Sequence, residues 1–377
     1  MKNDLCKQLG IEFPIFAFSH CGDVVAAVSR AGGLGVLGAL AYSAEELETE
    51  LAWIDAHVGG RPYGVDTVIP AAYVGKADGD LKKDDLEKLV PEAHKKFIDD
   101  LLKTHGVPEL PPGTEPTESL LGWSASSGRA HVEVALKHPI RLIANALGPP
   151  PADVIETAHA KGVLVAALCG TVPQALKQKA AGVDIIVASG YEAGGHTGEI
   201  GSMVLIPQVV DAVAPTPVLA AGGIGSGRQM AAAMVLGARG VWTGSLWLTT
   251  RESDCLPALI DKMLAATSSD TVRSKCISGK PARQLKTAYT EAWGGASSPG
   301  TLPMPLQYMA TASATHRINR YAQTNKPGSA DLLGTPVGQV VGQLKEVRSV
   351  KRVIEEMVAE YVDSVEGASE VLQRAAE

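Results

Sequence analysis

Short apolar runs that end in Gly, Ser, Thr or Pro alternate with alanine-rich segments of helical period along most of this chain of 377 residues. This alternation is typical of repeated βα units around a parallel sheet. Because the runs are nearly continuous in Val, Ile, Leu and Ala, we expect strands that are buried on both faces, as in a closed parallel barrel. Eight runs are predicted to be strands: 14–18, 34–37, 63–69, 141–146, 163–168, 184–189, 217–221 and 240–243.

The regular spacing of the strands breaks once, between the third and the fourth. There the segment at about 75–129 is too long for one crossover, and we expect a charged helix over 80–103 followed by a proline-rich link over 107–113. The helix carries an apolar stripe, which favours packing on its own barrel over a contact within a homodimer, and both alternatives stay open. The stripe consists of Leu81, Leu86, Leu89, Phe97 and Leu101.

Beyond residue 250 the alternation stops, and loops rich in Pro and Gly separate helical pieces until a final helix over 344–362. The predicted fold class is therefore α/β: a (β/α)8 barrel, or TIM barrel, with an inserted helical segment and a C-terminal helical lid subdomain. We expect the barrel over 1–253, a lid for the substrate over 254–335, and over 336–377 a helical end that returns to the barrel.

Composition limits the classes of function. The net charge is −7, and no stripe of Lys and Arg interleaves with aromatic residues, so nucleic acid and anionic membranes are disfavoured as partners. Five cysteines stand far apart without a CxxC pair, which predicts reduced thiols and no metal site. No stretch approaches the ~20 apolar residues that cross a bilayer, and the N-terminus has no apolar signal core. We therefore expect a cytoplasmic enzyme with a small-molecule substrate.

In a (β/α)8 barrel the active site lies at the carboxyl ends of the strands, so the loops after the strands hold the candidate site. Two of these loops are rich in glycine: 221–228 has the sequence Ala-Gly-Gly-Ile-Gly-Ser-Gly-Arg, and 243–245 has the sequence Thr-Gly-Ser. Glycine lets the backbone approach an anion closely, while the next helix presents free N–H groups. Together the two loops predict a phosphate site after strands seven and eight, with plain tight turns as the alternative.

The loop after the sixth strand, 190–198, surrounds a single imidazole with glycines. Its His196 can face a cofactor, and there it can act as a base near neutral pH or donate a hydrogen bond to a substrate oxygen. The alternative is a histidine that only stabilises the loop. Glu192 of the same loop either faces the site or accepts hydrogen bonds from N–H groups of the loop.

These segments closely resemble the nitronate monooxygenase family, formerly called 2-nitropropane dioxygenases. The resemblance rests on 192–198, 221–224 and 244–245, in this order and spacing, and extends to 31–38 and 278–283. It covers most of the chain apart from the insertion. It implies a barrel that binds flavin mononucleotide (FMN) and uses no metal.

The resemblance also implies roles for single residues. His196 would lie over the isoalloxazine ring as the catalytic base or as the group that binds the nitro group. The phosphate of FMN would be bound by Gly222, Gly223, Gly244 and Ser245. The remaining contacts to FMN would come from the ends of strands one and three and from the histidine loop. They are Ala17, Phe18, Ser19, Asp66, Glu192, Gly194 and Gly195.

The reaction that the resemblance implies is the oxidation of alkyl nitronates with FMN and dioxygen, which gives a carbonyl compound and nitrite. Two other functions stay open. One is the NAD(P)H-dependent reduction of a quinone or an enoyl thioester through FMN, because nicotinamide can stack on flavin without a separate nucleotide-binding unit. The other is a barrel that binds flavin without catalysis.

The chain departs from the family pattern at three places. Residues 17–21 are Ala-Phe-Ser-His-Cys where relatives often have Ala-Pro-Met, Asp66 stands where relatives usually have Asn, and 166–169 lack the lysine that some relatives carry after strand five. An ionised Asp66 near the flavin would disfavour an anionic semiquinone, unless a partner cation cancels its charge. These departures bear on the nitronate chemistry more than on flavin binding.

Overall fold

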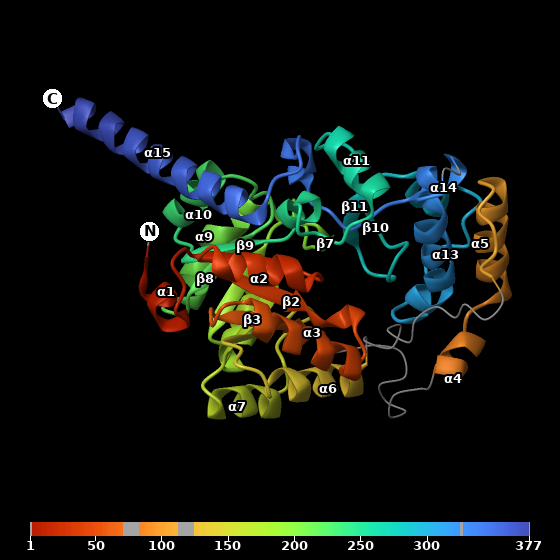
Figure 1. Ribbon diagram of the computed structural model, residues 1–377, viewed down its shortest axis with the longest axis horizontal. Helices are drawn as coiled ribbons and strands as arrows, with labels where there is room; N and C mark the ends of the chain where they lie inside the picture. Colours follow the sequence, from red (N-terminus) through yellow and green to blue (C-terminus); the bar gives the residue numbers. More distant parts are fainter. Residues whose placement is uncertain (1, 71–82, 112–123, 325–326, 377) are drawn as a thin grey trace.

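The computed structural model describes residues 2–70, 83–111, 124–324 and 327–376. Eight parallel strands form a closed barrel in the order β1-β2-β3-β4-β5-β6-β8-β9 (Figure 1). The strands are β1 (Ile15–Ser19), β2 (Leu34–Gly38), β3 (Tyr63–Thr67), β4 (Leu142–Asn145), β5 (Leu164–Cys169), β6 (Ile185–Ser189), β8 (Val218–Ala221) and β9 (Gly240–Thr243). The ends of each strand differ by at most two residues from those of a predicted run, which confirms the (β/α)8 barrel.

Side chains on the barrel strands alternate between two packed layers, because successive residues of a strand point to opposite faces. Inside the barrel lies a cluster that includes Phe16, Leu34, Leu142, Ile185 and Trp242. The residues between these positions pack outward against the helices in a second, larger cluster. The barrel is therefore filled, and a binding site can form only at one of its ends.

Helices between the strands cover the outside of the barrel (Figure 1). They are α2 (Gly22–Arg30), α3 (Ala44–His57), α6 (Ala125–Ala135), α7 (Ala152–Ala160), α8 (Val172–Ala180), α9 (Ser202–Val213) and α10 (Gly227–Val235). Local sequence fixes where they begin. The Ser43 hydroxyl accepts the N–H of Glu46 at 3.2 Å, and the Glu46 carboxylate accepts the N–H of Ser43 at 2.7 Å, so a reciprocal cap starts α3. The short α1 (Asp4–Leu9) precedes β1.

The insertion after β3 contains two helices, α4 (Lys83–Lys88) and α5 (Glu92–Thr104), where we predicted one helix over 80–103. That prediction was wrong because Pro91 lacks an N–H group and disfavours a helical conformation in the residue before it. Pro91 itself is the N-cap residue of α5. Residues 75–82 and 112–123 of the predicted insertion lie outside the described residues.

The apolar face of α5 packs on the C-terminal part of the same chain, so the expectation that it packs on its own barrel was wrong. Phe97 lies edge-on to Trp293, with ring centroids 4.9 Å apart. The guanidinium group of Arg317 donates to the carbonyl groups of Val107 and Pro108 at 3.1 and 2.9 Å, which fastens the proline-rich link. Figure 1 shows α5 beside α13 (Leu306–Ala322).

The C-terminal part also contains a small sheet that we did not predict. It is antiparallel, in the order β10 (Thr271–Ser274), β11 (Ala282–Leu285) and β7 (Gly195–His196). Because β7 belongs to the histidine loop, this sheet joins that loop to residues far along the chain. The helices around it are α11 (Pro257–Ala265), α12 (Ala288–Gly294), α13 and α14 (Pro327–Leu332).

The last helix, α15 (Val350–Ala376), begins and ends later than the predicted range of 344–362. Just before the predicted range, residues Gln339–Gln343 form a 3-10 turn, η5. α15 packs along α10 and α2, and Figure 1 shows its end projecting past the barrel. Among the described residues, no helix combines the length and the apolar character that a membrane crossing requires.

Candidate active site

The carboxyl ends of β1 and β3 form one side of the barrel mouth. Phe18 faces inward there and stacks on Trp242, with ring centroids 6.4 Å apart. Ala17 belongs to the outer cluster, and the Ser19 hydroxyl accepts the N–H of Cys21 at 3.1 Å. Of the three residues proposed from strand one, only Phe18 therefore turns its side chain into the mouth, and alternation along the strand is the physical reason.

The loop after β8 has the backbone geometry that a bound anion needs. Gly222 and Gly223 have φ angles of +92° and +72°, which side-chain-bearing residues rarely adopt. Within the described part of the chain, the N–H groups of Gly223 and Ile224 have no hydrogen-bond partner. These two N–H groups are therefore available to donate hydrogen bonds to the predicted phosphate.

The helix after this loop does not present a free first N–H group, which corrects one part of that expectation. The N–H of Gly227 donates to the Glu360 carboxylate of α15 at 2.8 Å. A side chain at Gly227 would meet the carbonyl oxygen of Met357 at 2.0 Å, so α15 lies directly on the start of α10. An anion at this edge would be held by the loop amides and not by the end of α10.

The segment around Gly338 lies between the loop after β9 and the histidine loop, 190–198, and contacts both. The N–H of Gly338 donates to the Ser245 hydroxyl at 2.8 Å, and a side chain at Gly194 would lie 2.7 Å from the nitrogen of Gly338. Gly195 has a φ of +74°, and the Phe18 ring lies 3.8 Å from the position of a Cβ on Gly244. The structure thus brings the predicted residues of three loops together around one end of the barrel.

Glu192 caps a helix. Its carboxylate accepts the N–H of Ser202 at 3.0 Å and the Ser202 hydroxyl at 2.8 Å, at the first turn of α9. A negative charge is stabilising at this end of a helix. Both contacts support the interpretation of Glu192 as part of the loop architecture rather than as a ligand for a cofactor.

His196 lies on β7, where it pairs with Ala282 of β11. Its Nε2 lies 2.7 Å from the Ser278 hydroxyl oxygen. Burial, and to a lesser extent the positive charge of Lys280, lower the pKa of His196 to about 4. The imidazole is therefore neutral around pH 7, so it can exchange hydrogen bonds with a ligand but is a weak base.

Sequence reasoning missed Ser278 and Lys280 as site residues. The N–H of Lys280 donates to the Ser278 hydroxyl at 3.3 Å, and the Lys280 ammonium group acts electrostatically on the His196 ring. Within the described residues, no anionic group acts on Lys280, and burial lowers its pKa. The signal was present in 278–283, which matched the family, but nothing local placed this segment beside His196.

Asp66 is buried near the carboxyl end of β3. It is 5% exposed, and its Oδ1 atom has no hydrogen-bond partner within the described residues. Burial raises the pKa of Asp66 to about 7. At the end of β2, which pairs with β3, the carbonyl oxygen of Gly38 lies 2.9 Å from His20 Nδ1, and desolvation of the imidazole lowers the pKa of His20. No set of three or more His, Cys, Asp or Glu residues among those described could hold a metal ion.

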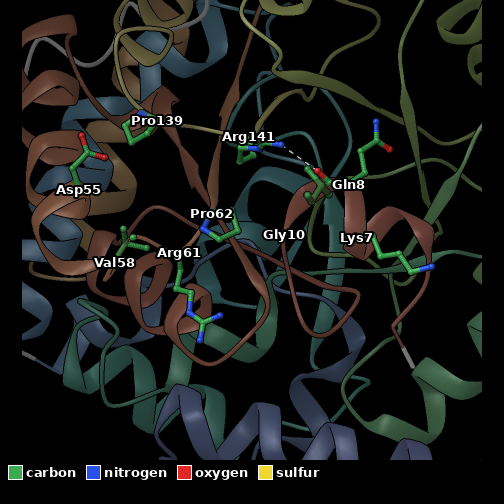
Figure 2. Close-up of a pocket in the computed structure, with 11 residues that line it drawn as sticks. Lys7, Gln8, Gly10, Asp55, Val58, Arg61, Pro62, Pro139 and Arg141 are labelled. Atoms are coloured by element: carbon green, nitrogen blue, oxygen red, sulfur yellow. Dashed lines mark hydrogen bonds between the residues drawn. The ribbon is translucent and has the colours of Figure 1, made fainter.

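A surface depression of about 470 Å³ lies at the opposite end of the barrel, before the strands begin (Figure 2). Its wall includes Pro62, just before β3, and Arg141, just before β4, whose guanidinium donates to the Gln8 carbonyl group at 3.2 Å. In barrels of this type the amino ends of the strands serve stability, whereas the carboxyl ends serve chemistry. We therefore assign no reaction to this depression.

The closed barrel, the glycine turns after its last two strands and the partly buried histidine define a class, the flavin-dependent oxidoreductases with a TIM-barrel fold. Within that class the chain belongs to the nitronate monooxygenase family, whose model matches residues 2–360. It is 52% identical over 383 residues to a Mycobacterium tuberculosis protein described as a monooxygenase, and the match covers 99% of this chain and 100% of that protein.

Two further relatives agree with this assignment. A Staphylococcus aureus protein described as a nitronate monooxygenase is 30% identical over 329 residues, which cover 83% of this chain and 86% of the relative. Among solved structures, the nitroalkane oxidase of Streptomyces ansochromogenes superposes with a TM-score of 0.79 at 25% identity, covering 97% of this chain and 100% of that one. The names of both relatives refer to the oxidation of nitro compounds.

Proposed function

We propose that this protein oxidises alkyl nitronates with FMN and dioxygen and releases a carbonyl compound and nitrite. The observation that carries the proposal is the pair of His196 and Lys280, a neutral imidazole beside a partly buried ammonium group that has no anionic partner among the described residues. A nitronate is an anion that brings the missing negative charge. Two nitronate ions and one dioxygen balance two carbonyl compounds and two nitrite ions.

The residues at the barrel mouth fit FMN. The free N–H groups of Gly223 and Ile224 suit a phosphate, and the left-handed turn at Gly222 and Gly223 keeps side chains away from it. The aromatic ring of Phe18 supplies apolar surface for the flavin beside the Gly244 backbone. FMN, when bound, supplies the one-electron redox chemistry that lets a nitronate react with dioxygen.

The side chains around His196 would bind and orient the substrate. The Lys280 ammonium attracts the nitronate oxygens, and the imidazole of His196 donates a hydrogen bond to one of them. Ser278 fixes the imidazole through Nε2. Because His196 has a pKa of about 4, it is poorly suited to remove a proton from a neutral nitroalkane, which favours the nitronate as the substrate.

Residues 254–335 would enclose this substrate as a lid. Ser278 and Lys280 both belong to this range, and β11 joins it to the histidine loop through the pairing with β7. A closed site keeps water from the charged substrate, which strengthens its interaction with Lys280.

The test is to purify the protein, identify its bound flavin by absorbance, and mix it without oxygen with an alkyl nitronate. We expect the flavin absorbance to bleach, and oxygen uptake with release of nitrite when air is admitted. The neutral nitroalkane at the same concentration should react much more slowly. Bleaching by NADH or NADPH, together with no change on adding nitronate, would refute the proposal in favour of a nicotinamide-dependent reductase.

A further inference from the structure

Asp66 occupies a position at the barrel mouth that sets it apart from every other carboxyl group named above. Its neighbour Val65 packs in the outer cluster, so alternation along β3 turns Asp66 inward. In register beside it stand Gly38 of β2 and Ala144 of β4. The His20 imidazole and the Phe18 ring fill the space over Gly38, whereas Ala144 carries only a methyl group, so the carboxyl group has room on the Ala144 side at the edge where a flavin would lie.

The environment of Asp66 favours its neutral form. The residue is 5% exposed, and its Oδ1 atom accepts no hydrogen bond from the described residues. Burial alone raises its pKa to about 7, since no charged group contributes to the shift. Burying a carboxylate without a partner is strongly unfavourable, whereas a neutral acid avoids most of that cost.

Titratable groups on the elements packed against β3 do not supply a counter-ion. His20 is exposed at its surface, but desolvation of its imidazole beside Gly38 lowers its pKa, so it is neutral at pH 7. The others face the outer side or the far end of the barrel. They are Tyr63 on β3, Asp23 and Arg30 on α2, and Arg129, His131 and Glu133 on α6.

We propose that Asp66 is a neutral carboxylic acid that donates a hydrogen bond to the ring system of the bound flavin. The role rests on the flavin binding proposed above. The carbonyl oxygens and ring nitrogens of a flavin accept hydrogen bonds, so the buried acid would find there the partner that the described residues do not provide. A neutral acid also adds no negative charge beside a ring that gains electron density on reduction.

The test compares the wild type with D66N, which keeps a neutral donor, and with D66A, which removes it. Binding of FMN is measured by fluorescence quenching, and the reduction potential of the bound flavin is measured at about pH 6 and about pH 9. At the lower pH, D66N should bind FMN nearly as tightly as the wild type, while D66A should bind it about tenfold more weakly. Between the two pH values, the wild-type potential should fall more steeply than that of D66N, because only the wild type gains a negative charge.

Two results would overturn the proposal. One is the same change of potential with pH in the wild type and D66N. The other is wild-type affinity for FMN that rises above neutral pH, since that is expected of a carboxylate that accepts a hydrogen bond from the flavin. Normal FMN binding without reduction by nitronates would refute the proposed substrate alone, whereas a wild type that binds no FMN would refute both proposals.

Discussion

The Ser278 hydroxyl oxygen lies 2.7 Å from Nε2 of His196, although 82 positions separate the two residues in the chain. The pairing of β7 with β11 brings them together, because Ala282 stands opposite His196 in that register. The orientation of the imidazole therefore depends on a contact between two distant segments.

Replacing Ser278 with alanine should lower kcat for nitronate oxidation about fivefold, since a typical hydrogen bond contributes about 1 kcal/mol. The flavin content should stay unchanged, because Ser278 acts on the orientation of His196. Steady-state kinetics and flavin absorbance of S278A check this. S274A is the matched control, as the Ser274 hydroxyl accepts the N–H of Cys276 in the same segment, at 3.2 Å. Equal turnover in S278A and the wild type would contradict the role given to this contact.

Replacing Lys280 with methionine should raise KM for nitronate about tenfold or more, because the anion loses its charged partner. Lys280→Arg should retain most of the affinity. Lys275→Met removes the same charge from an exposed position nearby and should leave KM unchanged. A KM that is insensitive to the charge at position 280 would remove the reason for preferring an anionic substrate.

The same variant should change the titration of His196. A neighbouring positive charge disfavours the protonated imidazole, so its removal should raise the pKa of His196 from about 4, while burial keeps it below 6.5. NMR spectra recorded between about pH 3 and about pH 8 follow the ring directly. In the wild type the His196 signals should stay constant above about pH 5.5, where an ordinary histidine titrates.

Replacing Glu192 with glutamine should lower the free energy of unfolding by about 1–2 kcal/mol, because the first turn of α9 loses its negatively charged cap. Urea denaturation followed by circular dichroism measures this. E199Q serves as a control, since the Glu199 side chain is 86% exposed and its contact with Arg273 is long, at 3.8 Å. If Glu192 instead acted on the flavin, E192Q would change the flavin spectrum and leave the stability unchanged.

Alanine at two glycines should separate folding from flavin binding. G222A should lower the free energy of unfolding by about 1–2 kcal/mol, because alanine is strained at a φ of +92°. Gly244 has a φ of −129°, and its nearest neighbour, Phe18, lies 3.8 Å from an added Cβ, so G244A should fold normally. G244A should nevertheless bind FMN more weakly, because the new methyl group keeps the ligand from the backbone. Denaturation curves and FMN titrations of both variants test this pair.

Local patterns were sufficient to predict the barrel. Each strand is a short apolar run between turn residues. Residues close together in the sequence are therefore enough to recognise it. The same alternation that predicts strands could also have shown that Ala17 and Ser19 face outward when Phe18 faces inward. Pro91 was likewise a readable break in the predicted helix over 80–103.

The arrangement around His196 could not be predicted in this way. β7 contains two residues, which is too short for any periodicity, and its partner strand lies in a region where the βα alternation has stopped. Ser278 and Lys280 reach the imidazole only through this long-range pairing. The burial of Asp66 without a partner also depends on the residues of β2 and β4 on either side of β3. It could therefore not be predicted from the sequence around position 66.

Because β7 has only two residues, the activity of the enzyme should be lost at a lower temperature than the one at which its barrel unfolds. The barrel strands are held by continuous ladders, whereas β7 pairs with β11 at only two positions, Gly195 with Arg283 and His196 with Ala282. Small units of this kind open before the rest of a protein unfolds. On warming, turnover should therefore disappear while the barrel still gives its full circular dichroism signal, and brief heating followed by cooling should restore the lost activity.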